Sequence, residues 1–259
     1  MKQLFVGADP EIFLVNAISG ALTSAIGRIG GSKYEPRQLP LGHGFAVQED
    51  NVALEYNIPA SDSQQSLVDN INKAMTHLLE MVGQQGLSFS RESAAFFPED
   101  QLQHPAALEF GCDPDFNAWS GKMNPRPKAT DATLRSCGGH VHIGTDTTGL
   151  DRAALMRRCD LFLGVPSQLM DNGHLRKKLY GKAGAFRPKP YGAEYRTLSN
   201  YWIFRPELVA WVYQNTRLAL DAEHLPVEEE KEAILDAINH NNSAAARHLV
   251  DKYNIPMVM

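Results

Sequence analysis

The sequence is poor in cysteine, and it has neither a long apolar run nor an excess of positive charge. Its three cysteines, Cys112, Cys137 and Cys159, are widely spaced and form no CxxC pair, which argues against a disulfide framework and against a thiolate zinc site. The net charge of −5 gives no electrostatic footprint for nucleic acid or for an anionic membrane. We therefore expect no nucleic-acid binding and no membrane association.

The N-terminal apolar segment is interrupted by Asp9, Pro10 and Glu11, and no stretch reaches the length of a membrane span. We expect no export signal, and the sparse cysteines fit a reducing cytoplasm. A chain of 259 residues with 43% apolar content can bury a substantial core. The simplest partition is one catalytic domain over residues 1–259, with a helical C-terminal extension over 205–259.

Two histidines stand two residues apart in a short apolar run bracketed by glycines, Gly138-Gly139-His140-Val141-His142-Ile143-Gly144. This spacing predicts a strand, on which side chains two apart project from the same face. His140 and His142 would then share one cavity, where neutral imidazoles can bind a metal ion or a phosphate. The alternative is that one or both are hydrogen-bonded core histidines.

Three other segments place carboxylates at short intervals among β-favouring residues. Residues 3–15 predict a strand kinked at Pro10, on which Asp9 and Glu11 face the same way. Residues 48–58 predict a second strand, with Glu55 on its polar face near Asp50, and residues 191–196 predict a third that carries Glu194 and Arg196. Buried carboxylates are costly unless a cation accompanies them, so their convergence with the histidines predicts a metal site on a sheet.

The remaining segments predict the surroundings of that site. A helix is expected from a capping box at Ser61 and Gln64 to Gly83, another over 151–163, and helical covering from Pro206 onwards, with Glu228 to Glu232 as a solvated face. The loops 16–44 and 111–128 are the expected seat of substrate specificity. Residues 174–190 are basic and rich in glycine and proline, which suits phosphate binding because arginine offers a bidentate fork; the alternative is a solvated basic loop.

The ordered blocks GADPEIF, EDNVALEYNIP, GGHVHIG and YGAEYRTLSN resemble the glutamine synthetase and glutamate-cysteine ligase superfamily, and more closely its phage-encoded carboxylate-amine ligases. The blocks span residues 7 to about 200. The resemblance implies an α+β fold with a curved, mainly antiparallel sheet and helices packed on its outer face. It also implies an ATP-dependent ligase that forms an amide bond through an acyl phosphate, in the cytoplasm, or in the host cytoplasm if the protein is phage-encoded.

Roles for individual residues follow from the same resemblance. Metal ligation of two or more Mg²⁺ or Mn²⁺ ions is implied for Glu11, Glu55, His140 and Glu194, with Asp9 and Asp50 as further ligands. Binding of ATP is implied for His142, Arg187, Arg176 and Lys189. The residues expected to act in catalysis are Arg196, Arg187 and Glu55, with Arg196 holding a substrate carboxylate or the transferring phosphoryl group. Where relatives often have Glu, this chain has Asp9 and Asp50, whose shorter reach would change how ions are held.

The implied chemistry suits these residue types. A carboxylate is a poor acyl donor, so a ligase first moves the γ-phosphoryl group of ATP onto it, and an amine then attacks; the protein needs mainly to position and neutralise charge. Mg²⁺ and Mn²⁺ prefer carboxylate oxygens with occasional histidine. Two alternatives stay open at this point: a metal-dependent hydrolase that uses His140, His142 and carboxylates, and a non-catalytic binding module. The sequence leaves the two substrates, a carboxylate and an amine, and the oligomeric state undetermined.

Overall fold

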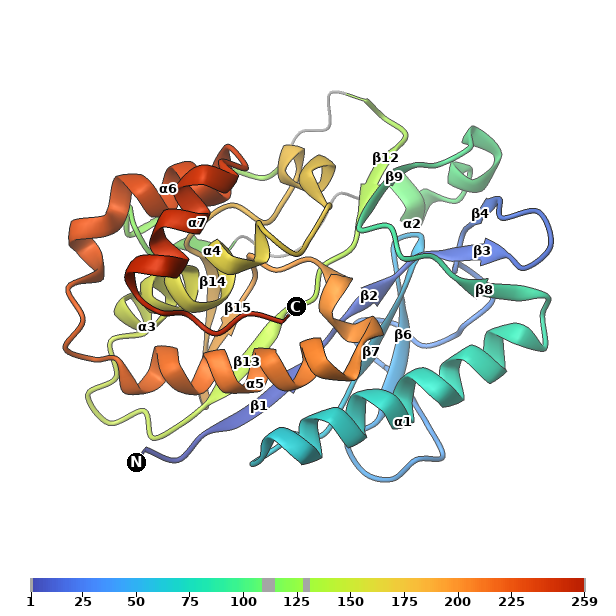
Figure 1. Cartoon of the computed structure of the whole chain (residues 1–259). Coiled ribbons are helices and arrows are strands. Elements are labelled where there is room, and N and C mark those ends of the chain that lie inside the picture. Colours follow the sequence, from blue (N-terminus) through green and yellow to red (C-terminus); the bar gives the residue numbers. More distant parts are fainter. Residues whose placement is uncertain (1, 109–114, 128–130, 259) are drawn as a thin grey trace.

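The computed structural model describes residues 2–108, 115–127 and 131–258. Its largest sheet has six antiparallel strands, in the order β1 (Phe5–Ala8), β13 (Val141–Gly144), β15 (Gly192–Tyr195), β14 (Ala185–Lys189), β10 (Phe116–Asn117) and β11 (Lys122–Met123). The histidine segment therefore lies between the N-terminal strand and the strand that carries Glu194. Segments far apart in the sequence meet at the centre of this sheet (Figure 1).

A second antiparallel sheet holds the other carboxylates, in the order β2 (Glu11–Ile12), β7 (Ala53–Asn57), β6 (Ala46–Asp50) and β5 (Arg37–Gln38). Smaller antiparallel sheets join β4 (Leu22–Thr23), β3 (Leu14–Asn16) and β8 (Leu87–Phe89), and β12 (Leu134–Ser136) with β9 (Ala94–Phe96). The expected kink at Pro10 is the point at which the chain leaves β1 of the first sheet and enters β2 of the second.

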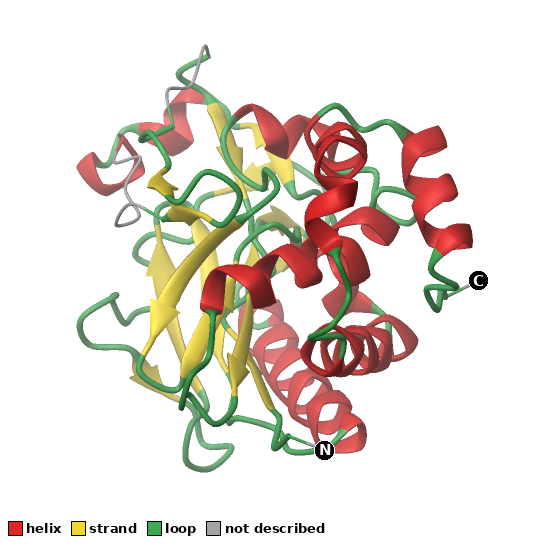
Figure 2. Cartoon of the chain, turned by 90° about the vertical axis from the view of Figure 1, so that its left-hand side faces the viewer, coloured by secondary structure: helices red, strands yellow, loops and turns green. Residues whose placement is uncertain are grey.

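Helices cover one side of the strands, which Figure 2 shows as a helical layer beside the sheet layer. The longer helices are α1 (Gln64–Gly83) and α5 (Pro206–Asp221), which lie side by side in Figure 1. The others are α3 (Arg152–Cys159), α6 (Lys231–Asn239), α7 (Ser243–Lys252) and the short α2 (Pro105–Leu108) and α4 (Val165–Ser167). A π-helical turn, η2 (Asp160–Gly164), and the 3₁₀ turns η1 (Glu99–Leu102), η3 (His174–Lys178), η4 (Asn200–Phe204) and η5 (Val227–Glu230) complete the set. The expected α+β class with mainly antiparallel sheets is confirmed.

The core forms because α1 turns one apolar stripe toward the interior. Its residues Leu67, Ile71, Ala74, Leu78 and Val82 are fully buried, and each large aliphatic side chain contributes roughly 1.5–3 kcal/mol on burial. They belong to one hydrophobic cluster that includes residues from Leu4 to Ile255. Within the described part of the chain, no helix combines the length and hydrophobicity needed to cross a bilayer.

Two local expectations were wrong. The N-cap of α1 is Ser63 rather than Ser61, and its capping box is closed by Ser66, because the backbone of Ser61 is bonded to Val6 instead. Residues 48–58 form a hairpin rather than one strand, since Asn51 adopts a φ of 53° that turns the chain between β6 and β7. This turn brings Asp50 and Glu55 onto neighbouring strands.

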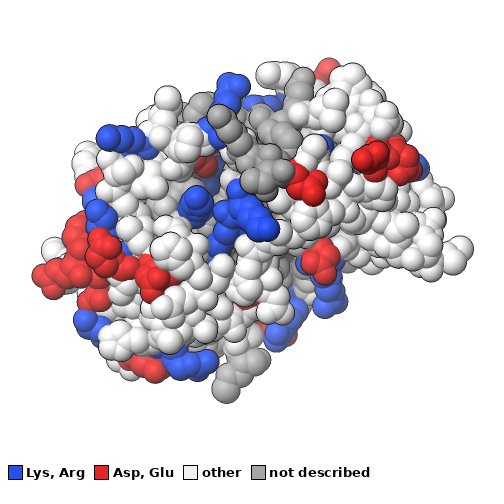
Figure 3. All heavy atoms as spheres, turned by 90° about the horizontal axis from the view of Figure 1, so that it is seen from above, with Lys and Arg blue, Asp and Glu red and all other residues white. Residues whose placement is uncertain are grey.

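Other expectations are confirmed. Helix α5 begins at Pro206, and α6 and α7 occupy the predicted C-terminal helical region. Of the acidic residues expected to be solvated, Glu228, Glu229 and Glu232 are exposed, whereas Glu230 is half-buried because Lys252 and the Tyr253 hydroxyl donate to it. Figure 3 shows acidic side chains gathered at its left-hand edge and basic side chains near the middle of the face. The loop 16–44 contains β4 and β5; of the loop 111–128, residues 111–114 and 128 lie outside the described residues.

Candidate active site

The candidate site lies where the chain passes between the two larger sheets. Two hydrogen bonds join Gly138 to Glu11. The Gly138 carbonyl accepts from the Glu11 backbone N–H at 2.9 Å, and the Gly138 N–H donates to Glu11 Oε2 at 2.7 Å. These bonds dock the start of β2 beside the glycines that precede β13. The early carboxylates and the histidine strand are thereby fixed next to one another, as the sequence predicted.

One group of residues, the histidine cluster, consists of Asp9, His140, His142 and Glu194. His142 and Glu194 are direct cross-strand partners on β13 and β15. Asp9 lies between the two imidazoles, with Oδ2 at 3.1 Å from His142 Nε2 and Oδ1 at 3.2 Å from His140 Nδ1. Ligand atoms of Asp9, His142 and Glu194 all lie within 4.8 Å of one another, so these three could hold one ion.

Basic residues surround Glu194, which is completely buried. Lys189 Nζ lies 2.8 Å from its Oε2, Arg187 Nη1 lies 3.6 Å from its Oε1, and Arg196 Nη1 donates to Oε1. Arg187 and Lys189 point to this carboxylate because they are two residues apart on β14, and therefore on the same face of the strand, beside β15. Three of the residues expected to bind phosphate or act in catalysis are thus gathered at one carboxylate.

In the histidine cluster, neighbouring positive charges lower the pKa values of the two carboxyl groups. Burial acts to raise the pKa of Asp9, but the charge of His142 and hydrogen bonds from both histidines hold it well below its ordinary value. Burial and the charge of Asp9 act to raise the pKa of Glu194, yet Arg196 and the histidines lower it to about 2. The pKa of His140 falls to about 4, through burial and the charge of Arg196. Asp9 and Glu194 are therefore ionised at neutral pH.

The second group, the acidic cluster, consists of Glu11, Asp50 and Glu55. Glu11 and Glu55 are direct cross-strand partners on β2 and β7, and Asp50 ends the neighbouring strand β6. One carboxylate oxygen from each lies within 4.8 Å of the others. Like charges directly opposite one another destabilise a sheet, so this arrangement needs a cation or protons.

Their pKa values are shifted in the direction opposite to that of Glu194. Burial, followed by the charge of Asp50, raises the pKa of Glu11 to about 7. Burial and the neighbouring carboxylates raise the pKa of Glu55 well above its ordinary value, and burial raises that of Asp50. Three converging carboxylates form the type of ligand set that Mg²⁺ or Mn²⁺ prefers.

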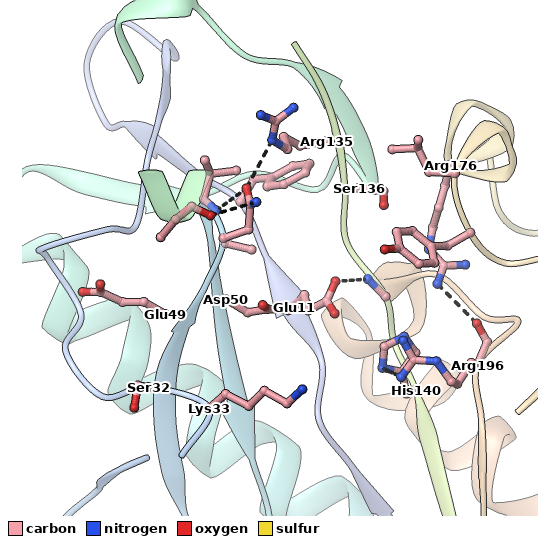
Figure 4. A pocket seen from close by; sticks show the side chains of 18 of the residues that line it. Glu11, Ser32, Lys33, Glu49, Asp50, Arg135, Ser136, His140, Arg176 and Arg196 are labelled. Carbon is pink, nitrogen blue, oxygen red and sulfur yellow. Dashed lines mark hydrogen bonds between the residues drawn. The ribbon is translucent and has the colours of Figure 1, made fainter. Parts of the chain in front are cut away.

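A cavity of about 350 Å³ opens beside the acidic cluster. Figure 4 shows Glu11 and Asp50 on one side of it and His140, Arg176 and Arg196 on the other. Arg176, which was expected to bind ATP, is almost fully buried and donates to the backbone carbonyls of Thr197 at 2.9 Å and Arg196 at 3.3 Å. It supports the strand that carries Arg196 while lining the cavity.

The six expected metal ligands are thus divided between two adjacent clusters rather than placed in one. Asp9 and Glu11, expected on one face of a strand, contribute to different clusters because Pro10 separates β1 from β2. His142, expected near phosphate, lies 3.1 Å from Asp9 and directly opposite Glu194. His140 both contacts Asp9 and lines the cavity.

Two residues at the site were given no role in the sequence analysis. Asp115 Oδ2 lies 3.4 Å from Arg196 Nε; Asp115 belongs to the loop 111–128 that was expected to carry specificity, but nothing in the sequence distinguished it from its neighbours there. The Tyr191 hydroxyl is hydrogen-bonded to His142 Nδ1, and the two rings are stacked with centroids 6.1 Å apart. Tyr191 could have been noticed because it opens the block that contains Glu194.

Comparison with known proteins supports the resemblance. No curated protein matches the sequence. Residues 130–252 match the family model described as phage phiEco32-like COOH.NH2 ligase-type 2. The match includes the strands that carry His140, His142, Glu194 and Arg196, whereas the two N-terminal carboxylate segments lie outside it. Over residues 130–252 the chain is thus similar to a family of carboxylate-amine ligases.

Proposed function

We propose that the protein is an ATP-dependent carboxylate-amine ligase that works through an acyl phosphate on a glutamine synthetase-like catalytic domain comprising residues 1–259, with 205–259 as its helical extension. The observation that carries this proposal is the pair of adjacent clusters beside a cavity that Arg196 and His140 line. A reaction between ATP and a carboxylate brings two anions together, so it requires concentrated positive charge at one place.

The acidic cluster fits a resident divalent ion, because three half-buried carboxylates lie together with pKa values raised by burial and mutual repulsion. Asp9, His142 and Glu194 fit a second ion. When bound, such ions would supply positive charge that screens the two reacting anions from each other. The proposal therefore includes Mg²⁺ or Mn²⁺ and ATP as cofactors.

The basic residues supply the rest of the chemistry in this proposal. Arg196 is held rigidly by Glu194 and Asp115, so its guanidinium is oriented before any substrate arrives. Facing the cavity, it would neutralise charge on the transferring phosphoryl group or on the substrate carboxylate. Arg187 and Lys189 would contact ATP phosphates from the neighbouring strand β14. The amine then attacks the activated carbonyl carbon and phosphate leaves.

Calorimetric titration with ATP and Mg²⁺ tests the proposal on wild type, on Glu194→Ala and on Glu228→Ala. Glu228 is exposed and pairs with Arg157 at 3.2 Å, so it serves as a matched control outside the site. We expect wild type and Glu228→Ala to bind Mg²⁺–ATP alike, and Glu194→Ala to bind at least about tenfold more weakly. Binding would justify a screen of carboxylate and amine pairs for ADP release.

Absence of nucleotide binding by the folded protein, with Mg²⁺ and with Mn²⁺, would contradict the proposal. Binding of Zn²⁺ under the same conditions would then favour a metal-dependent hydrolase that uses His140 and His142. Absence of both would favour a non-catalytic binding module.

A further inference from the structure

A buried carboxylate lies behind the site, on the opposite face of β15 from Glu194 and Arg196. Asp160 begins the π-helical turn η2 and is completely buried. Side chains alternate along a strand, so the residues on either side of Arg196 point away from the cavity and toward this turn. Asp160 Oδ1 accepts from the Tyr195 hydroxyl at 2.8 Å and lies 3.3 Å from Thr197 Oγ1, whose single proton it shares with the Lys182 carbonyl at 3.1 Å. One carboxylate oxygen thus holds both neighbours of Arg196.

The other oxygen of Asp160 reaches a different element. Oδ2 accepts from Trp119 Nε1 at 2.6 Å, and Trp119 lies in the turn between β10 and β11. The residue just before β10 is Asp115, whose carboxylate pairs with Arg196 at 3.4 Å. Asn124 fixes Asp115 in turn by donating to its Oδ1 at 2.8 Å and, from the backbone, to its carbonyl at 2.8 Å. Asp160 therefore reaches Arg196 by two routes, one through its strand and one through the hairpin that carries its acidic partner.

The backbone packs closely against Tyr195 and Trp119, at two glycines where a side chain would clash. A Cβ at Gly164 would lie 2.5 Å from the Tyr195 hydroxyl, and a Cβ at Gly184 would lie 2.7 Å from Trp119 Cδ1. The backbone N–H of Gly184 also donates to Asp160, although burial raises the pKa of this carboxyl to about 7. A carboxyl group suits this place because its two oxygens can accept from several neutral donors at once. These hydrogen bonds offset part of the cost of burying the group.

We propose that Asp160 is a positioning residue for Arg196: it holds β15 and the β10–β11 hairpin in the one arrangement that orients the guanidinium toward the cavity. The consequence for nucleotide binding rests on the proposed function, whereas the positioning of Arg196 does not. Groups behind a site residue commonly change ligand affinity or activity by about 10–100-fold. We expect the lower part of that range, since Glu194 also holds Arg196 directly.

The test follows the ¹H–¹⁵N signal of the Arg196 Nε group, identified as the signal that Arg196→Lys removes. Asp160→Asn keeps the shape but turns an amide N–H₂ toward a donor, and Trp119→Phe removes only the link to the hairpin. Thr216→Val is the control: Thr216 is equally buried and bonds within α5 to the Val212 carbonyl. We expect the Arg196 signal to shift or broaden in Asp160→Asn and Trp119→Phe, and to stay in place in Thr216→Val.

An Arg196 signal unchanged in both site variants would overturn the proposal, and Trp119→Phe alone decides it if Asp160→Asn fails to fold. Calorimetry with Mg²⁺–ATP gives the functional outcome, with an affinity roughly tenfold lower in Asp160→Asn. If wild type binds no Mg²⁺–ATP, the ligase proposal fails while the signal of Arg196 still decides the role of Asp160.

Discussion

The acidic cluster and the histidine cluster lie side by side, yet they balance charge in opposite ways. Glu194 in the histidine cluster is surrounded by Arg196, Arg187 and Lys189, and its pKa is lowered to about 2. Glu11 in the acidic cluster faces other carboxylates, and its pKa is raised to about 7. Burial is similar in kind at both places, so the difference comes from the neighbouring charges.

This difference separates two functions of buried carboxylates. A carboxylate neutralised by arginine and lysine orients those cations, and the protein itself satisfies it. In the acidic cluster, the charges of Arg196 and Arg176 act on Glu11 but do not offset burial and the neighbouring carboxylates, so its pKa stays raised; such a group is stabilised by protons or by an added cation. We therefore infer that the acidic cluster is the stronger candidate for a resident metal ion, and that the histidine cluster holds the basic residues in place for an anionic ligand.

The largest expected effect is on the free energy of unfolding, which should fall in Glu194→Gln and rise in Glu55→Gln. In metal-free protein at neutral pH, Glu194→Gln leaves Lys189 without its carboxylate and Arg196 with Asp115 alone, and loss of one partner of a buried ion pair costs about 3–5 kcal/mol. Burial and the neighbouring carboxylates raise the pKa of Glu55 well above its ordinary value, so its carboxyl group disfavours folding at neutral pH. Glu55→Gln removes this cost, and the free energy of unfolding should rise. Urea unfolding in the presence of EDTA measures both.

The control for this pair is Glu228→Gln at the exposed ion pair with Arg157, where a change below about 1 kcal/mol is expected. If Glu194→Gln and Glu55→Gln destabilise the metal-free protein equally, the two clusters do not differ in charge balance as described.

A smaller effect is expected on metal affinity. Glu55→Gln replaces one charged ligand of the acidic cluster and should weaken Mn²⁺ binding by about 100-fold, at the upper end of what supporting groups around a metal produce. Glu49→Gln is a matched control on β6, because Glu49 lines the cavity but accepts hydrogen bonds from the backbone of Ile29 and Gly30 at 3.1 and 2.8 Å. Electron paramagnetic resonance of free Mn²⁺ gives the affinities. Equal weakening in both variants would place the ion elsewhere.

The sequence predicted the parts of this site that depend on strand periodicity and on order along the chain. His142 lies on β13 and His140 immediately before it, beside β15, which carries Glu194 and ends just before Arg196; the prediction succeeded because alternation along an extended chain follows from local chemistry. The break at Pro10 and the start of α5 at Pro206 were equally accessible, since proline lacks a backbone donor and fixes φ.

What the sequence could not show depends on tertiary contacts. The hairpin at Asn51 requires a left-handed residue, and its side chain is held by the carbonyls of Ala106 and Ala107, far along the chain. The separation of Asp9 from Glu11 depends on which sheet each segment joins. Arg176 lies in a basic segment and was expected to bind phosphate. Its hydrogen bonds to the carbonyls of Thr197 and Arg196 became visible only in the structure. The role of Asp115 likewise depends on an ion pair between distant segments.

The effect that is smallest per step, because it is spread over several pH units, is a change in the slope of stability against pH on the two sides of pH 4.5. The folded-state pKa of Glu11 is about 7, above its ordinary value of 4.5, so the folded protein binds this proton more tightly and the free energy of unfolding falls as pH rises through that interval. The slope is at most about 1.4 kcal/mol per pH unit for one proton. The pKa of Glu194 is lowered to about 2, so its stabilisation is present above pH 4.5 and is lost as pH falls toward 2.

Metal-free protein should therefore be most stable near the pH at which these two slopes meet. Urea unfolding in EDTA from about pH 3 to about pH 8 measures the curve. Glu11→Gln should flatten the decline above pH 4.5 and leave the loss at lower pH unchanged, because Glu194 is untouched. Added Mn²⁺ should restore stability mainly above pH 7, where ligand carboxylates no longer have to release protons to bind it. A metal-free stability maximum at neutral pH, insensitive to Glu11→Gln, would mean that the carboxylates of the acidic cluster are already compensated within the protein.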